Sequence, residues 1–352
     1  MQHKWMYVLF IILIIGLFYI PTSKQTIEPL NGVIDTPTLI DKSSLVVKRN
    51  DYSTLVNIHR GNTNDVLLLI HGTPLDQTIW QPIISYLQNK KDTGKKVPSV
   101  VTYDLRGFGS ASDMHIDMSY INVDTSSIAW NWDDYVEDLR TVHLEVAGNS
   151  KVHVAGWGFG GMIAQKYALK YPNNINRLYL LQTLGSPMTT IQPFMYKLTQ
   201  YLMSNDNKYH LLDTDLINQI LCNWFYITNK TICGNNTSDP SKHIDQTDTE
   251  GYKTARSLLI KTNARVLLQT LKLMMNIHTL SEWSDKEYPF QRIFVLSTTD
   301  DQIATPNTIV KLMDSLQQKN VPILVPMVHS GKHYFTFETP DMIANLFCQH
   351  LK

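Results

Sequence analysis

The chain has 352 residues, of which 43% are hydrophobic and 18% are charged, so it can bury a large core and lacks the composition of a disordered chain. Lysine plus arginine and aspartate plus glutamate both number 31, which leaves a formal net charge of zero. Because no excess positive charge would attract polyanions, the composition argues against a nucleic-acid partner.

The N-terminus is strongly apolar, and residues 5–20 (WMYVLFIILIIGLFYI) contain no charged side chain. As a helix this segment would be about 24 Å long, somewhat shorter than a hydrocarbon core of about 30 Å. The residues after it offer no small-residue cleavage site, which favours a single-pass membrane anchor over a cleaved signal peptide, although both stay open. We predict a membrane anchor or signal over residues 1–23 and a polar linker over residues 24–42.

Short apolar runs then alternate with helical patterns. Residues 44–48 and 54–59 are predicted strands, and residues 65–70 (DVLLLI) and 99–103 (SVVTY) are runs typical of strands in a parallel sheet. A helix is predicted over residues 132–146, a strand over 152–155, a helix over 160–171 and a strand over 177–182. This alternation predicts right-handed crossovers and a largely parallel sheet.

The alternation stops near residue 186 and returns near residue 287. The intervening stretch has a helical pattern interrupted by a polar loop over residues 228–248. After it we predict a strand over residues 292–297, a helix over 307–319, a strand over 322–327 and a helix over 340–351. The predicted domains are therefore a first core part over residues 43–185, a cap insertion over 186–286 and a second core part over 287–352.

The predicted cap carries features of a secreted protein. Cys222 and Cys233 are close enough in sequence to form a local disulfide, and glycosylation sequons begin at Asn229, Asn235 and Asn236. Together with the apolar N-terminus they favour placement in the secretory lumen or outside the cell. A mitochondrial inner-membrane protein is the alternative.

Residues 152–161 (VHVAGWGFGG) have the pattern of a strand that turns sharply into a helix. In a G-x-S-x-G nucleophile elbow the outer glycines permit this turn, and the central serine attacks a carbonyl carbon. Here the central residue is Gly158, which tolerates the backbone of the turn but has no hydroxyl. The pattern therefore predicts the fold of an acyl-transfer enzyme without its attacking atom.

Five segments, in this order, resemble landmarks of the α/β-hydrolase superfamily across residues 43–352: HGTPLDQTIW, YDLRGFGSAS, GWGFGGMIAQKYALKYP, DDQIATP and SGKHYFTFETP. The resemblance implies an α/β-hydrolase fold, in which helices flank a mostly parallel sheet and a helical cap is inserted. It places Gly158 at the nucleophile position.

The resemblance also implies the other site residues. His333 takes the place of the general base, and Asp301 that of the acid which orients it, with Asp300 as the alternative. The backbone N–H groups of Thr73 and Phe159 would form the oxyanion hole. His71 is expected to orient the loop that carries Thr73.

Neither a cofactor nor a metal is expected. His329 and His333 are four residues apart, but Gly331 between them argues against a helical metal pair. The first hypothesis is a catalytically inactive pseudo-hydrolase, attached to a membrane, that binds a small apolar ligand or other protein subunits, for example within a membrane complex. The alternatives are an active or inactivated serine hydrolase, or base chemistry by His333 and Asp301 without a nucleophile.

Overall fold

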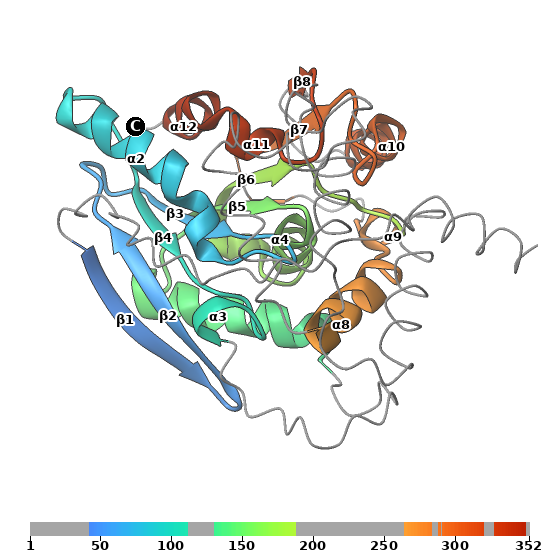
Figure 1. The fold of residues 1–352 in the computed structure, drawn as a ribbon, viewed down its shortest axis with the longest axis horizontal. Helices are drawn as coiled ribbons and strands as arrows, with labels where there is room; N and C mark the ends of the chain where they lie inside the picture. Colours follow the sequence, from blue (N-terminus) through green and yellow to red (C-terminus); the bar gives the residue numbers. More distant parts are fainter. Residues whose placement is uncertain are drawn as a thin grey trace, which may run out of the picture. The chain divides into compact units, whose positions relative to one another are not determined.

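The computed structural model describes residues 42–111, 130–187, 264–283, 288–289, 291–319 and 327–349 (Figure 1). Within these residues eight strands form one sheet in the order β1-β2-β4-β3-β5-β6-β7-β8. Pairing is antiparallel for β1 with β2 and for β2 with β4, and parallel from β4 through β3 to β8. The strands are β1 (Lys42–Arg49), β2 (Tyr52–His59), β3 (Val66–Ile70), β4 (Ser99–Thr102), β5 (Val152–Trp157), β6 (Ile175–Leu181), β7 (Arg292–Thr298) and β8 (Met327–His329).

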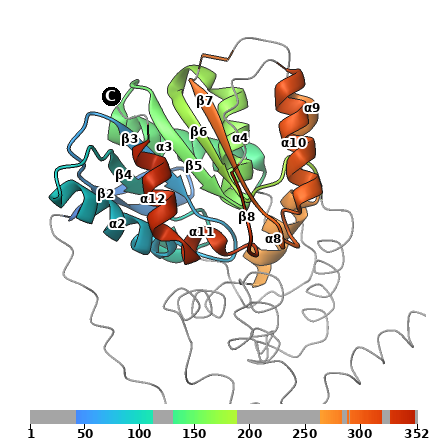
Figure 2. The ribbon, with the colours of Figure 1, turned by 90° about the horizontal axis from the view of Figure 1, so that it is seen from above.

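Helices cover both faces of this sheet, and Figure 2 shows α4 and α12 on opposite sides of the strands. One apolar cluster joins the sheet to α3, α4, α8 and α10, and a second joins it to α2, α11 and α12. The helices are α2 (Gln81–Asp92), α3 (Trp132–Ala147), α4 (Phe159–Lys170), α8 (Ala264–Met274), α9 (Thr279–Glu282), α10 (Pro306–Gln318), α11 (Phe335–Glu338) and α12 (Pro340–Cys348), with short 3-10 turns η1 (Gln77–Trp80), η2 (Gly109–Ala111) and η4 (Pro172–Asn174).

Local sequence explains where α3 begins and ends. The side chain of Asn131 accepts hydrogen bonds from the N–H groups of Asp133 and Asp134, and the Asp134 carboxylate accepts one from the Asn131 N–H. This capping box satisfies backbone donors that the first helical turn leaves without partners. The helix ends at Gly148, whose φ of +57° favours glycine.

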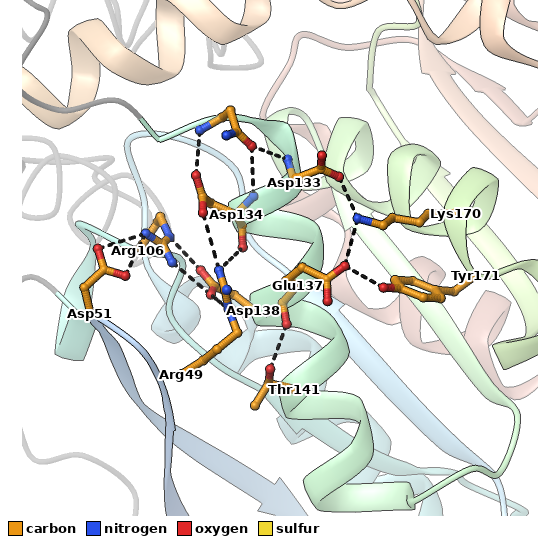
Figure 3. Close-up of polar contacts among 11 residues, drawn as sticks. Arg49, Asp51, Arg106, Asp133, Asp134, Glu137, Asp138, Thr141, Lys170 and Tyr171 are labelled. Atoms are coloured by element: carbon orange, nitrogen blue, oxygen red, sulfur yellow. Dashed lines mark hydrogen bonds and ion pairs between the residues drawn. The ribbon is translucent and has the colours of Figure 1, made fainter.

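A buried ion pair fastens the first strands to α3 (Figure 3). Arg106 donates to both carboxylate oxygens of Asp138, at 2.7 and 3.0 Å, and both side chains are almost fully buried. Arg49 of β1 donates a third bond to Asp138 at 2.8 Å and reaches the Asp134 carbonyl oxygen at 3.1 Å. Two guanidinium groups thus compensate one buried carboxylate, which fixes β1, the loop after β4 and α3 to one another.

Most predicted elements agree with the structure to within a few residues. Helix α2 was not predicted, and of the strand predicted over residues 322–327 only Met327, the first residue of β8, is described. Helices α8 and α9 belong to the predicted cap, whereas the rest of it, with Cys222, Cys233 and the three sequons, is outside the described residues.

The predicted anchor over residues 1–23 also lies outside the described part of the chain. Among the residues that are described, no helix combines the length and the apolar character needed to span a membrane.

Candidate functional site

Gly158 stands at the turn between β5 and α4, with φ at +54°. A Cβ atom added there would lie 3.3 Å from His333 Nε2 and 3.8 Å from His333 Cε1, and apart from its neighbours in the chain no other described residue would be within 4 Å. A side chain at this position would therefore point at His333. The positive φ strains any residue other than glycine, but the surrounding space does not exclude one.

The neighbouring glycines are required for a different reason. A Cβ atom on Gly156 would lie 2.3 Å from the Gly160 carbonyl oxygen, and one on Gly160 would lie 2.3 Å from the Ile70 carbonyl oxygen. On Gly161 it would lie 2.5 Å from Thr183 Cβ. These contacts let the start of α4 pack directly against the ends of β3 and β6.

The structure brings His333 and Asp301 together. His333 Nδ1 lies 2.8 Å from Asp301 Oδ2, and each residue is only 3% exposed. The other carboxylate oxygen of Asp301 accepts hydrogen bonds from the N–H groups of Ile303 and Ala304, both at 2.8 Å. These donors fix the position of the Asp301 carboxylate, which orients the imidazole with its Nδ1–H toward Asp301 and its Nε2 toward Gly158. Asp300, the predicted alternative, is exposed and bonds to Thr299.

Thr73 and Phe159 have backbone N–H groups without an acceptor among the described residues. Phe159 is the first residue of α4, where an amide has no partner within the helix. Thr73 follows Gly72, whose close neighbour is the indole of Trp157 in β5. Two backbone donors therefore follow the ends of the adjacent strands β3 and β5.

The Thr73 side chain contacts α8, which belongs to the predicted cap. Thr73 Oγ1 lies 3.2 Å from Thr270 Oγ1, and the Thr270 hydroxyl donates to the Leu267 carbonyl oxygen at 2.9 Å. Because each hydroxyl has one hydrogen, Thr73 must donate to Thr270. Helix α8 therefore holds the Thr73 side chain in one orientation.

His71 supports the backbone of the same loop. Its Nε2 accepts a hydrogen bond from the Leu105 N–H at 2.9 Å, and its Nδ1 lies 3.0 Å from the Gly72 carbonyl oxygen. Complete burial lowers the pKa of His71, against the opposing effect of Asp104, so the ring is neutral and Nδ1–H donates to Gly72.

Two residues of the site were not identified from the sequence. Trp157 donates its indole N–H to the His333 carbonyl oxygen at 3.1 Å, and the two ring centroids are 5.0 Å apart. Gln182, at the end of β6, bonds to both loops that carry His333 and Asp301. Neither has a sequence signal, because its role depends on contacts with residues more than a hundred positions away.

A metal is not suggested by the described residues, which contain no cluster of three or more histidine, cysteine, aspartate or glutamate side chains suited to an ion. His329 is the last residue of β8, whereas His333 lies in the loop after that strand, so the two do not share one helical turn.

Comparison with known proteins gives consistent matches. A family model described as the alpha/beta hydrolase fold matches residues 65–330. A solved hydrolase of Pseudomonas aeruginosa superposes with a TM-score of 0.62 at 15% identity, covering 88% of this chain and 98% of that one. An esterase of Thermogutta terrifontis gives a TM-score of 0.59 at 15% identity, covering 87% and 96%. At these identities the two structures support the fold alone.

Curated relatives match over shorter segments. A pimeloyl-[acyl-carrier protein] methyl ester esterase of Legionella pneumophila is 31% identical over 121 residues, which cover 34% of this chain and 38% of the relative. A 1-acylglycerol-3-phosphate O-acyltransferase of Homo sapiens is 28% identical over 138 residues, covering 39% and 35%. A proline iminopeptidase of Lactobacillus delbrueckii is 29% identical over 137 residues, covering 39% and 42%. The match thus spans less than half of each relative.

Proposed function

This chain belongs to the α/β-hydrolase family, and from that premise we propose that it binds a small molecule at the family's site without hydrolysing it. The observation that carries the proposal is the direction in which a side chain at position 158 would point, straight at His333 Nε2. In this proposal the position is that of the nucleophile, and glycine supplies no atom to attack a carbonyl carbon. Removing the nucleophile of a serine hydrolase lowers turnover by about 10⁶-fold, so ordinary ester turnover would be lost.

The remaining polar groups favour a ligand with a carbonyl or carboxylate oxygen. The N–H groups of Thr73 and Phe159 can donate to such an oxygen, and the N-terminal end of α4 adds favourable electrostatic potential for negative charge. The names of two curated relatives, a methyl ester esterase and an O-acyltransferase, refer to acyl chemistry and support this ligand class. We propose that an acyl group, with an apolar remainder, occupies the space beside Gly158.

Restoring the hydroxyl tests the missing nucleophile. The natural protein should not react at this turn with a fluorophosphonate probe, whereas Gly158→Ser should be labelled at the introduced serine and should hydrolyse a p-nitrophenyl ester. Gly148→Ser is the matched control, since Gly148 has nearly the same φ but lies at the end of α3. Esterase activity of the natural protein that is lost in His333→Ala would contradict the proposal.

Ligand binding is tested separately with octanoate as the probe. Titration should shift the backbone amide resonances of Thr73 and Phe159 and the imidazole resonances of His333. The same titration of Gly158→Val should show weaker binding, because the valine side chain would fill the proposed oxygen position. Equal binding by both proteins would place the probe elsewhere and contradict the proposed site.

Base chemistry by His333 and Asp301 is the second candidate. The observation that favours it is the buried 2.8 Å contact between the two side chains, which is present although residue 158 is glycine. Such a pair could remove a proton from a bound molecule. Exchange of an acidic C–H proton for deuterium that is lost in His333→Gln would support this candidate over binding alone.

We also propose that residues 5–20 attach the protein to a membrane, on the basis of their apolar sequence. Sedimentation of the full chain with vesicles, and its loss when residues 1–23 are deleted, is the expected result. Full sedimentation of the deleted form would contradict it.

A further inference from the structure

The last residue of β6 and the two residues after it contact the turn at Gly158 and the loops of Asp301 and His333. The Leu181 carbonyl oxygen accepts a hydrogen bond from the Gly158 N–H at 3.0 Å, and the Thr183 hydroxyl donates to the Gly158 carbonyl oxygen at 2.6 Å. Gln182, between them, directs its side chain to the loops of Asp301 and His333. Three consecutive residues therefore hold the turn, the acid loop and the histidine loop.

Gln182 is completely buried and uses both ends of its amide. Its nitrogen donates to Thr298 Oγ1 at 2.9 Å and to the Lys332 carbonyl oxygen at 2.7 Å, and lies 3.4 Å from Asp301 Oδ2. Its oxygen accepts a hydrogen bond from the Thr336 hydroxyl at 2.8 Å and a longer one from the Thr336 N–H at 3.3 Å. The amide thus joins the end of β7 to the residues on both sides of His333.

The backbone of Gln182 has a φ of +46°, which is unusual for a residue that is not glycine. Its N–H donates to the Leu296 carbonyl oxygen of β7 at 2.9 Å, so the conformation is held on both the main chain and the side chain. A strained backbone persists where surrounding contacts over-determine it, and such residues are concentrated at functional sites. Glycine would relieve this strain but would lose the amide.

We infer that Gln182 is a positioning residue, which sets the geometry of His333 toward Asp301 and toward the space beside Gly158. It deepens the proposed function, since it concerns the same site. The amide nitrogen lies 3.4 Å from Asp301 Oδ2, and its bond to the Lys332 carbonyl oxygen fixes the backbone next to His333. Without it the Lys332 carbonyl oxygen would keep only the longer hydrogen bond from the Thr298 hydroxyl of β7, at 3.2 Å.

The test uses the His333 imidazole of the full chain, observed by proton and nitrogen NMR. In the natural protein the Nδ1–H bonded to Asp301 should give a low-field resonance protected from exchange with water. Gln182→Met retains the side-chain length without the amide and should broaden or remove this resonance. Gln182→Gly should have the same effect although it relieves the backbone strain. Asn50→Gly is the matched control, because Asn50 has a φ of +49° in an exposed turn far in sequence from these loops.

An unchanged His333 resonance in folded Gln182→Met and Gln182→Gly would overturn the inference. If neither variant folds, Thr336→Val is the second test, since it removes one donor to the Gln182 oxygen and leaves the backbone intact. It should speed the exchange of the His333 Nδ1–H, and an unchanged rate would also overturn the inference. None of these measurements needs a ligand or turnover, so equal octanoate binding by the natural protein and Gly158→Val would contradict the proposed function and leave this test valid.

Discussion

Asp138 and Asp301, two of the buried carboxylates among the described residues, differ in the kind of group that faces them. Asp138 is compensated by two guanidinium groups, which stay charged at any ordinary pH (Figure 3). Asp301 is held by two backbone amides and by His333, whose other nitrogen faces the space beside Gly158. The first carboxylate is fully engaged by structural partners, whereas the second holds an imidazole whose other nitrogen faces the turn at Gly158.

Replacing each aspartate with asparagine should give the largest difference in stability between the two sites. Asp138→Asn leaves the buried Arg106 guanidinium without a full counter-charge and should lower the free energy of unfolding by about 3–5 kcal/mol. Asp301→Asn should lower it by about 1–2 kcal/mol, because it weakens hydrogen bonds without leaving a buried guanidinium uncompensated. Urea denaturation measures both values. Equal losses would show that the Asp301 pair is as much a structural ion pair as the Asp138 pair.

Alanine substitutions at Gly156 and Gly158 compare a glycine needed for packing with the glycine that faces His333. Gly156→Ala places a Cβ atom against the Gly160 carbonyl oxygen, so the packing of α4 on the sheet must open, at a cost of about 3 kcal/mol or more. Gly158→Ala meets a side-chain atom of His333 rather than backbone and should cost about 1–3 kcal/mol for its strained backbone. Thermal unfolding compares the two variants. A larger loss for Gly158→Ala would mean that the space beside His333 is not available to a side chain.

Acidic pH should lower the free energy of unfolding through three buried histidines other than His333. Burial is the largest cause that lowers the pKa values of His71, His143 and His153. Each folded-state pKa is therefore below the ordinary value of about 6.5, so the unfolded chain takes up protons first. The stabilisation is complete above about pH 6.5 and is lost as the pH falls from there toward 5. Unfolding measured between pH 8 and 5 should show this decline.

A substitution at His143 measures how much of this pH dependence comes from that residue. His143→Gln should reduce the number of protons taken up on unfolding by about one at most, since His143 is one of three contributors. The pKa of Glu137 is also lowered, although burial opposes this, because Tyr171 and Lys170 bond to its carboxylate. Its contribution is lost only below the ordinary glutamate value of about 4.3, outside this range. A pH-independent stability between 8 and 5 would contradict the neutral state of these histidines.

The smallest effect is expected for the solvent-exposed ion pairs of Lys170. Lys170 bonds to Asp133 at 2.7 Å and to Glu137 at 2.9 Å, and its side chain is 40% exposed. Solvent screens these ion pairs, so Lys170→Met should change the free energy of unfolding by about 0.5 kcal/mol, and less at high salt. A loss comparable to that of Asp138→Asn would mean that solvent exposure does not make the Lys170 ion pairs weaker than the buried Asp138 pair.

The sequence predicted the parts of this site that depend on local patterns. The apolar runs of β3 and β5 and the glycines of the turn have periodicities and spacings that can be read from neighbouring residues. His333 and Asp301 were placed by the resemblance of their loops to a known family, and the structure joins them. Gln182 and Trp157 were not found, because hydrogen bonds between distant loops leave no periodic pattern. Helix α2 was missed although Ile83, Ile84 and Leu87 form its buried face.

The hydrogen bond from Thr73 to Thr270 has a consequence for selectivity. The only hydroxyl hydrogen of Thr73 is committed to α8, so the lone pairs of its oxygen are what this side chain can still offer. A molecule that docks against this side chain would gain by contributing an alcohol or an N–H group, and a plain hydrocarbon would not. For the acyl ligand that we propose, α8 would therefore help to decide which functional group next to the carbonyl is preferred, without contacting the ligand itself.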